Sequence, residues 1–294
     1  MKRQFKTTSF PDFNRRFPDD QACLDHIARA RFGDPPRCPK CESSPTLHSY
    51  KIPRQLFCRS CQSVISIMAG TAFANSIINA RVWFYIILLM ANKTTGISTN
   101  FVARHLNLTQ KASFRALKAI RTHITLLTEQ RRFGAYASHV QVDEAWLPWV
   151  KIPGKSSQNG AIIFGLHDFR GVQTWIIKDR RRETLLPIIR QFVEPGSIII
   201  SDYHKGYDRL SNFGFEHIRL NHSKAEWVNP EGFSMLGIEG YWSNLKYYMR
   251  SHNRNPDESS LRGYLDEHAF RYNARKQGKC VFEELIAAFP TLDR

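Results

Sequence analysis

Two pairs of cysteines constrain this 294-residue chain more strongly than any other feature of its sequence. Cys38 and Cys41 form one Cys-x2-Cys pair, Cys58 and Cys61 form a second, and sixteen residues separate the pairs. Tetrahedral zinc takes four thiolates, and a loop of this length lets two such pairs face each other around one ion. Because four protein thiolates leave no open coordination position, we expect structural Zn. The alternative is four cysteines that are buried separately.

The basic residues are concentrated in the first half of the chain. Residues 1–138 contain 21 Lys and Arg against 7 Asp and Glu, whereas residues 139–294 contain 21 against 19. The net charge is therefore +14 in the first part and +2 in the second, out of +16 in total. A strongly basic half followed by a balanced half suits a DNA-binding region joined to a domain with another task. We expect double-stranded DNA as a partner.

No segment of the sequence has the pattern of a membrane span or an export signal. The longest apolar run, Val82–Ala91, has ten residues, about half of the roughly 20 that cross a bilayer. The N-terminal segment Met1–Phe10 is basic and polar and lacks an apolar region. We therefore expect a cytoplasmic protein without a membrane partner, associated with the nucleoid if the source is bacterial, whose cysteines serve as metal ligands rather than disulfides.

Residues 96–125 have the pattern of a helix-turn-helix. The polar turn Asn107–Thr109 separates two helical pieces, and Thr109 is a suitable N-cap for the second. Lys111, Arg115 and Lys118 would then point outward, where they could contact DNA phosphates or bases. Ordinary helical hairpins share this pattern, so it is compatible with either role.

From His139 onward the sequence changes from helical periodicity to short strand-like runs. Strands are expected at residues 140–147, 161–166, 172–178, 197–201 and 216–220, and helices at residues 183–192 and 236–250. Three strands followed by helix, strand, helix, strand and helix is the element order of a ribonuclease-H-like α/β domain, in which helices flank a mixed sheet. Further helices are expected at residues 17–32 and 80–92.

These patterns divide the chain into three regions. Residues 1–75 are expected to form an N-terminal helix and a zinc ribbon, and residues 76–135 a helical, helix-turn-helix-like DNA-binding region. Residues 136–294 are expected to form the ribonuclease-H-like domain.

Three acidic residues occupy positions that suit metal-dependent phosphodiester chemistry, which needs carboxylates converging from different elements. Asp143 lies inside a strand among apolar neighbours, where an unpaired acid is costly. Asp202 directly follows Ile198–Ile200, at the end of an expected central strand. Glu239 begins a helix, and Lys246, seven residues later, lies on the same helical face. Each acid could instead be an ordinary turn or cap residue.

The motifs together resemble one known family. Besides the cysteine pairs, the resemblance rests on Met68–Phe73 (MAGTAF), Lys93–Ser98 (KTTGIS), Val142–Trp146 (VDEAW), Asn221–Lys224 (NHSK) and Ile238–Lys246 (IEGYWSNLK). In this order they are similar to the DDE transposases of bacterial insertion sequences that carry an N-terminal zinc ribbon and an ISXO2-like transposase domain, relatives of the eukaryotic Merlin transposases. Almost the whole chain is covered. The segment 144–148 departs from the family, which has an aromatic and Gly-rich sequence there.

The resemblance implies catalysis by Asp143, Asp202 and Glu239, which would hold Mg or Mn and have 58 and then 36 residues between them. It also implies DNA contacts by Lys246, and we expect Arg250 to contribute to them. Glu226 and Glu231 compete with Glu239 for the third position, and His222 either lines the site or is only packed.

The expected activity is metal-dependent cleavage of a DNA strand at the element end, followed by transfer of the freed 3′-hydroxyl to target DNA. We expect a homo-oligomer in the DNA complex. The alternative is a catalytically inactive DNA-binding protein descended from a transposase. A serine or tyrosine recombinase is disfavoured, because nothing in the sequence calls for a nucleophilic side chain.

Overall fold

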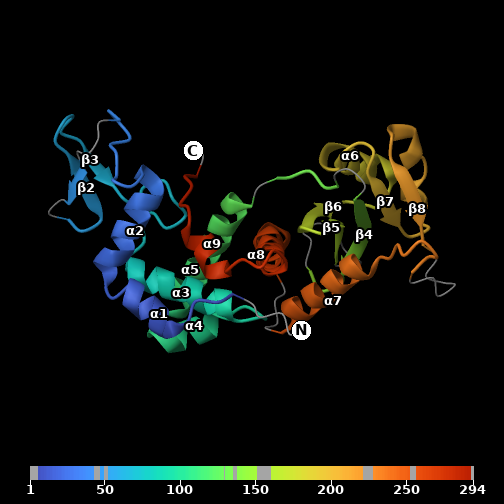
Figure 1. Ribbon diagram of the computed structural model, residues 1–294. Coiled ribbons are helices and arrows are strands. Elements are labelled where there is room, and N and C mark those ends of the chain that lie inside the picture. The colour runs from blue at the N-terminus through green and yellow to red at the C-terminus, as the bar shows by residue number, and fades with distance from the viewer. Residues whose placement is uncertain are drawn as a thin grey trace. The chain divides into compact units, whose positions relative to one another are not determined.

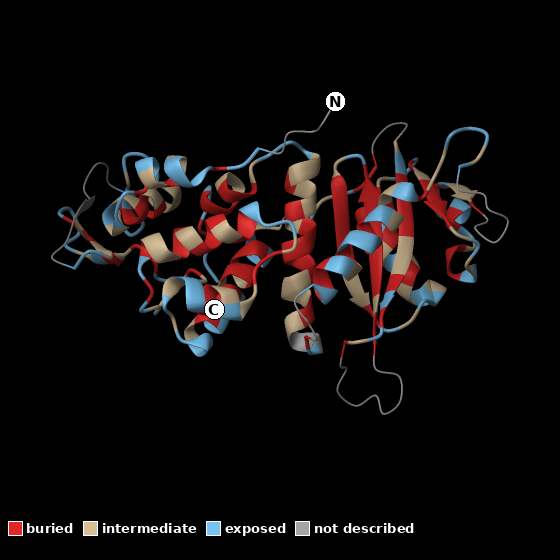
Figure 2. Ribbon diagram, turned by 90° about the horizontal axis from the view of Figure 1, so that it is seen from below, coloured by how far each residue is buried: buried red, intermediate tan, exposed pale blue. Residues whose placement is uncertain are grey.

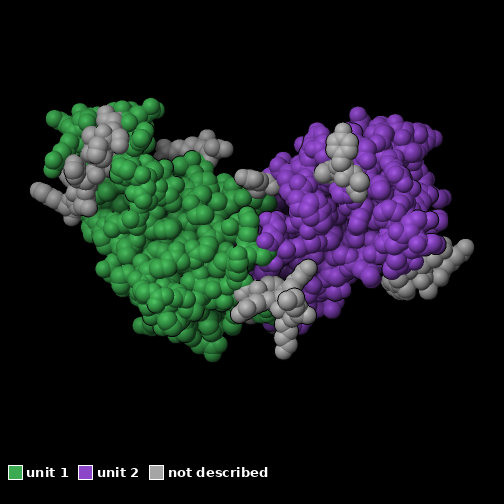
Figure 3. All heavy atoms as spheres, viewed as in Figure 1, with its two compact units in different colours: residues 1–128, 278–294 green, residues 129–277 purple. Residues whose placement is uncertain are grey.

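The computed structural model describes residues 6–42, 47–49, 52–128, 130–134, 138–150, 160–220, 228–251 and 256–292, with only the backbone of residues 47–49, 258 and 259. The chain forms two compact units, which Figure 3 colours separately. Unit 1 comprises residues 1–128 and 278–294, and unit 2 comprises residues 129–277. Residues 278–294, expected with the ribonuclease-H-like domain, thus belong with the N-terminal unit. In the described part of the chain, no helix is long and apolar enough to span a membrane.

Unit 1 combines helices with a small antiparallel sheet. Its helices are α1 (Phe10–Arg16), α2 (Asp20–Phe32), α3 (Ala80–Asn92), α4 (Thr99–Leu106), α5 (Gln110–Leu127) and α9 (Val281–Ile286). Its sheet has the order β1-β2-β3, formed by β1 (Leu47–Ser49), β2 (Gln55–Cys58) and β3 (Val64–Ser66). The helices confirm those expected at residues 17–32 and 80–92 (Figure 1), and β2 ends at Cys58, the first cysteine of the second pair.

The core of unit 1 is built around α3, which is apolar on most of its surface and largely buried. The buried rings of Phe84 and Phe289 stack with centroids 6.1 Å apart, and Phe17 meets Phe84 edge to face at 4.9 Å. Helix α9 packs against α3 and is fastened to α5 by His123, whose Nε2 lies 2.8 Å from the carbonyl oxygen of Leu285. The last residues of the chain therefore complete the core that the first half begins.

Helices α4 and α5 flank the polar turn Asn107–Thr109, as the sequence predicts. Asn107 ends α4 in the left-handed conformation, with φ 51°, which asparagine tolerates better than most residues. The Thr109 hydroxyl accepts a 3.1 Å hydrogen bond from the amide of Ala112 and so caps α5, as the sequence predicts.

Unit 2 is built on a five-stranded mixed sheet with the order β6-β5-β4-β7-β8. The strands are β4 (His139–Leu147), β5 (Ala161–Asp168), β6 (Gly171–Ile177), β7 (Ile198–Ser201) and β8 (Glu216–Arg219). The pairs β4/β5 and β5/β6 are antiparallel, whereas β4/β7 and β7/β8 are parallel. Every expected strand is present, and the mixed sheet confirms the ribonuclease-H-like α/β class. Strand β7, which Asp202 follows, lies between β4 and β8 and is thus an interior strand, as expected.

Helices cover both faces of this sheet (Figures 1 and 2). On one face, α6 (Arg182–Phe192) buries Leu185 and Ile189 against Val140 and Val142 of β4. On the other face, α7 (Leu236–Arg250) and α8 (Glu258–Lys276) pack against the sheet, with Ala145 and Leu147 of β4 in their core. Alternate residues of β4 thus point to opposite faces, which decides where each acid of this strand lies.

Two elements differ from the sequence-based expectation. Between β7 and β8 the chain forms two short 3-10 helices, Lys205–Tyr207 and Leu210–Phe213, rather than an α-helix. Helix α8 was not predicted at all, because charged residues such as Asp266, Glu267 and Arg271 occupy its buried positions and remove the apolar periodicity.

Candidate functional site

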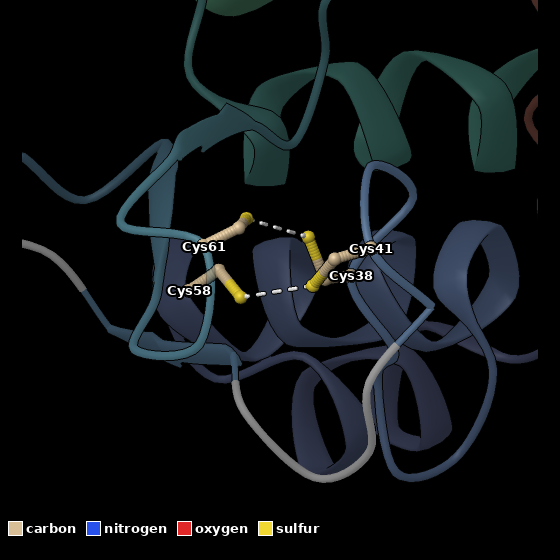
Figure 4. Close-up of side chains that lie close together, drawn as sticks. All are labelled: Cys38, Cys41, Cys58 and Cys61. Atoms are coloured by element: carbon tan, nitrogen blue, oxygen red, sulfur yellow. Dashed lines mark hydrogen bonds between the residues drawn. The ribbon is translucent and has the colours of Figure 1, made fainter.

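The four paired cysteines of unit 1 converge on one point (Figure 4). The Sγ atoms of Cys38 and Cys61 lie 3.7 Å apart, those of Cys41 and Cys58 lie 3.6 Å apart, and all four lie within 4.8 Å of one another. A tetrahedral Zn²⁺ ion with Zn–S bonds of about 2.3 Å has sulfur atoms about 3.8 Å apart. The geometry of the cluster therefore fits one tetrahedral ion.

The two cysteine pairs have matching local structures. The residue after each second cysteine, Glu42 and Gln62, has positive φ of 55° and 56°. Burial raises the pKa of the Cys38 thiol to about 11, against the effect of the backbone amides of Lys40 and Cys41, which point at its sulfur. These features are typical of metal-binding knuckles. In such a knuckle the chain turns sharply, so that backbone amides point at the thiolates that bind the metal.

Asp143 lies on β4 opposite Gly165 of β5, on the face of the sheet that α7 covers. Its Oδ2 accepts a 3.0 Å hydrogen bond from the indole Nε1 of Trp242, a residue of α7. A Cβ atom at position 165 would lie 2.7 Å from the Trp242 ring, so this strand position needs glycine. The close approach of helix and strand thus holds the carboxylate in a fixed orientation.

A second β4 residue, Gln141, fixes the start of α7. Its amide nitrogen donates to the Ser234 carbonyl at 2.8 Å, and its amide oxygen accepts from the Ile238 nitrogen at 2.8 Å. Because Gln141 and Asp143 are two residues apart, they point to the same face and both contact α7. Sequence reasoning missed Gln141 and Trp242, which are linked to the acid only through the tertiary structure.

The environment of Asp143 disfavours its negative charge. Burial, helped by the nearby acids Glu144 and Asp202, raises the pKa of this carboxyl to about 7, against the lowering effect of hydrogen bonds from the Glu144 backbone and from Trp242. Asp143 and Asp202 come from neighbouring parallel strands, so the structure brings these two predicted acids close enough to influence each other.

Asp202 follows β7 and lies in the turn that leads to the first 3-10 helix. Its Oδ1 accepts a 2.9 Å hydrogen bond from the backbone nitrogen of His204, and its Oδ2 lies 3.8 Å from Arg180 Nη2. The same Arg180 nitrogen lies 3.0 Å from Oε2 of Glu144, whose side chain is only 2% exposed. Glu144 and Arg180, which sequence reasoning missed, form a charged contact beside the two predicted acids.

Glu239 lies in the first turn of α7, one turn before Trp242. With Ser243, Lys246 and Arg250 it forms a stripe of residues spaced three or four apart along one side of the helix. Arg250 is exposed and its guanidinium lies 4.8 Å from the ring centre of Trp149. Glu239 and Lys246 are thus on the common face that their spacing predicts.

The three predicted acids do not form a compact ligand set. Within the described ranges, the cysteines are the one group of three or more potential metal-binding residues whose ligand atoms all lie within 4.8 Å. Glu231, a competitor for the third position, is exposed in the segment before α7. Glu226 and His222 lie outside the described residues.

On α5 of unit 1, the predicted basic residues Lys111, Arg115 and Lys118 are all exposed. They are spaced three or four residues apart and so lie along one side of the helix. Phe114 is also exposed, at 50%. Sequence reasoning did not single out this ring, because a phenylalanine in an amphipathic helix is usually buried.

Each of the two units contains a segment that matches a known protein family. Residues 136–273 match the family model of the ISXO2-like transposase domain, and residues 18–64 match that of the transposase zinc-ribbon domain. An uncharacterized transposase-like protein of Haemophilus influenzae is 35% identical over 102 residues, which are 35% of this chain and 80% of the relative.

Solved structures with some likeness include a pre-cleavage Mos1 transpososome and a simian T-cell lymphotropic virus intasome in complex with the PP2A regulatory subunit B56 gamma. Both are 12% identical, and their TM-scores are 0.29 and 0.32. The first match covers 65% of this chain and 74% of the other, and the second covers 72% and 74%.

The relative is more than 30% identical and most of its length is covered, while the two family models account for the cysteine-bearing segment and for the five-stranded sheet with its acids. The chain therefore belongs to the ISXO2-like transposases that carry an N-terminal zinc ribbon.

Proposed function

We propose that this protein cuts DNA at the ends of a mobile element and joins the freed ends to target DNA, with Asp143, Asp202 and Glu239 as its catalytic carboxylates. The observation that carries the proposal is the arrangement of these acids on joined elements. Asp143 and Asp202 come from adjacent strands, and the hydrogen bond from Trp242 ties Asp143 to the helix that bears Glu239.

The residues fit a divalent cation. Burial of Asp143 and its acidic neighbours make its negative charge unfavourable, and a cation bound there would relieve this cost. Carboxylate oxygens are the ligands that Mg²⁺ and Mn²⁺ prefer. When bound, such a cation supplies stabilisation of charge on the scissile phosphate and a lower pKa of the attacking water.

The side chains of the protein itself orient the site. The Trp242 N–H donates to Oδ2 of Asp143 and the His204 amide donates to Oδ1 of Asp202, so each carboxylate is held by a fixed donor. Lys246 and Arg250 lie on the Glu239 side of α7 and would contact the DNA backbone along this helix. No covalent intermediate between protein and DNA is needed.

Unit 1 would hold the DNA. We propose that Cys38, Cys41, Cys58 and Cys61 bind one structural Zn²⁺, because their sulfur positions fit its coordination. The exposed stripe Lys111, Arg115 and Lys118 would contact phosphates and base edges, which the strong basic charge of residues 1–138 supports.

A cleavage assay on DNA that carries the terminal repeats tests the catalytic proposal. Asp143→Ala, Asp202→Ala and Glu239→Ala should each abolish Mg²⁺- or Mn²⁺-dependent cleavage while DNA binding persists. Glu216→Ala is the matched control, because this exposed acid lies at the opposite end of the same parallel strands. Full activity of Asp202→Ala would exclude the mechanism. If Glu239→Ala remains active while Glu226→Ala or Glu231→Ala loses cleavage, the residue whose change abolishes cleavage is the third carboxylate instead of Glu239.

If the wild-type protein binds this DNA but never cuts it with either metal, the catalytically inactive, DNA-binding alternative is correct. Lys246→Ala should behave differently from the acid variants. The loss of one phosphate contact should reduce the cleavage rate without removing metal dependence.

A further inference from the structure

A basic pocket opens beside Asp202, where the loop before α6 meets the turn after β7. Its volume is about 410 Å³, and its lining contains residues of the segments 180–183 and 204–206. Four of these residues are cationic and one is acidic: Arg180, Arg181, Arg182, Lys205 and Glu183. The pocket therefore carries a net positive charge at the margin of an otherwise acidic site.

The backbone fixes the shape of this pocket. A Cβ atom on Gly206 would lie 2.7 Å from the carbonyl oxygen of Arg180, so the turn after β7 approaches the loop before α6 more closely than any larger residue allows. The Gly206 nitrogen also donates to Nδ1 of His204 at 3.1 Å, which closes the turn. Close backbone packing thus holds the two cationic segments together, although their charges repel each other.

Arg180 joins the pocket to the acids. Its Nη2 atom lies 3.0 Å from Oε2 of the buried Glu144 and 3.8 Å from Oδ2 of Asp202. Because Glu144 points to the face of the sheet opposite Asp143, its contact holds Arg180 in place without involving Asp143. A guanidinium carries five N–H donors, so Arg180 can contact these acids and still present donors to a ligand in the pocket.

We propose that this pocket binds a backbone phosphate of the DNA strand that lies on the acids, with Arg181 and Lys205 as its main ligands. The inference rests on the proposed function, because it takes the bound molecule to be DNA. Both side chains are exposed, and cations paired with phosphate oxygens at a fixed site position a strand without reading its sequence. Arg180 offsets the repulsion between Asp202 and the phosphate.

DNA binding by the full-length protein, measured without added divalent metal, tests the pocket. The double variant Arg181→Ala/Lys205→Ala should bind DNA more weakly than wild type, and the loss of affinity should be the same for terminal DNA and for DNA of unrelated sequence. Its plot of log affinity against log salt should be shallower by about one, as expected for the loss of one phosphate contact. Arg190→Ala is the control, because this exposed arginine lies two turns further along α6 and contacts Phe213 instead. It should leave the slope unchanged.

Uncharged methylphosphonate linkages, placed one at a time along the DNA, locate the contact. Among the positions at which wild type loses affinity, one should have no effect on the double variant. Identical profiles for the two proteins would overturn the pocket. If the profiles differ but wild type never cleaves, the pocket stands and the proposed catalysis fails. If cleavage is normal and the profiles coincide, only the pocket fails. Absence of DNA binding by wild type overturns both.

Discussion

At the scale of single residues, the indole of Trp242 organises the candidate site. It donates to Asp143 and packs over Gly165, so that one side chain fixes both the orientation of the carboxylate and the distance between helix and strand. A hydrogen bond from a fixed donor to a metal-binding carboxylate tunes how well that ligand is presented.

Trp242→Phe removes the N–H donor while keeping an aromatic ring in the same space. The loss of a donor that orients a metal ligand typically reduces metal affinity or activity by about 10–100-fold. We therefore expect cleavage to require about tenfold more Mg²⁺, with DNA binding unchanged. A titration of cleavage rate against Mg²⁺ measures this, and Trp175→Phe, in strand β6, is the control. An unchanged Mg²⁺ requirement would mean that the hydrogen bond has no part in catalysis.

Gly165→Ala should destabilise unit 2, because its new Cβ would meet the Trp242 ring at 2.7 Å and force the helix outward. The cost of such overpacking is about 1–3 kcal/mol. Gly240→Ala offers the matched control on α7. Among the described residues, no atom beyond its chain neighbours and the nearby helix backbone lies within 4 Å of a Cβ at that position, so the change should be neutral or stabilising by up to about 1 kcal/mol. Urea unfolding followed by tryptophan fluorescence compares them, and equal stabilities would contradict the packing argument.

At the scale of elements, the zinc ribbon and the α4–α5 hairpin are specified by short local patterns. Matching cysteine spacings produce matching turns, with positive φ at Glu42 and Gln62. Likewise, Asn107 and Thr109 end one helix and cap the next.

The cysteine cluster should hold about one zinc ion per chain, and Cys38→Ser/Cys41→Ser should abolish binding, because two thiolates cannot replace four. Cys280→Ser, at a cysteine outside the cluster, should keep the metal. Metal analysis of protein prepared without chelators decides this. A zinc content near zero in the wild-type protein would refute the site.

Arg115→Ala/Lys118→Ala should weaken DNA binding and make its salt dependence shallower by about two, since each lost phosphate contact contributes about 0.9 to the slope. Both side chains are exposed, so folding should be unaffected. Affinity across a range of salt concentrations is the measurement. Arg29→Ala, an exposed arginine in α2, is the control, and an equal loss of affinity there would show that α5 has no special role.

At the scale of the whole molecule, the chain leaves unit 1 at residue 128 and returns to it at residue 278. Phe282 and Leu285 of α9 are fully buried in unit 1. A fragment that ends at residue 138 would lack these side chains and expose the core of α3. Experiments on the DNA-binding half therefore need the full chain, or a fragment to which residues 278–294 are restored.

Buried histidines should make the protein acid-sensitive. Burial lowers the pKa of His123 to about 4, whereas an unfolded histidine has a pKa of about 6.5. The unfolded state then binds a proton that the folded state does not, so stability is lost as pH falls from about 6.5 to 4. For His123 the loss between pH 7 and pH 5 is about 2 kcal/mol. The free energy of unfolding of His123→Gln should therefore fall by about 2 kcal/mol less than that of wild type between pH 7 and pH 5. Urea titrations at the two pH values measure this, and an equal fall in both proteins would contradict the role of His123.

The sequence alone determined much of the local structure. The cysteine knuckles, the cap at Thr109, all five strands of unit 2 and the positions of Asp143, Asp202 and Glu239 at strand, strand end and helix start follow from spacing and periodicity. Such features depend on residues that are near one another in the chain, so their patterns are visible before the fold is known.

Only the tertiary structure decided how distant segments meet. The contact of Trp242 with Asp143 and Gly165, the pairing of Glu144 with Arg180, the packing of α8 on the sheet and the return of α9 to unit 1 each join residues far apart in sequence. No local periodicity encodes such pairs. In α8, buried charges conceal the helix itself, because a charged residue is stabilised there by partners that only the folded chain supplies.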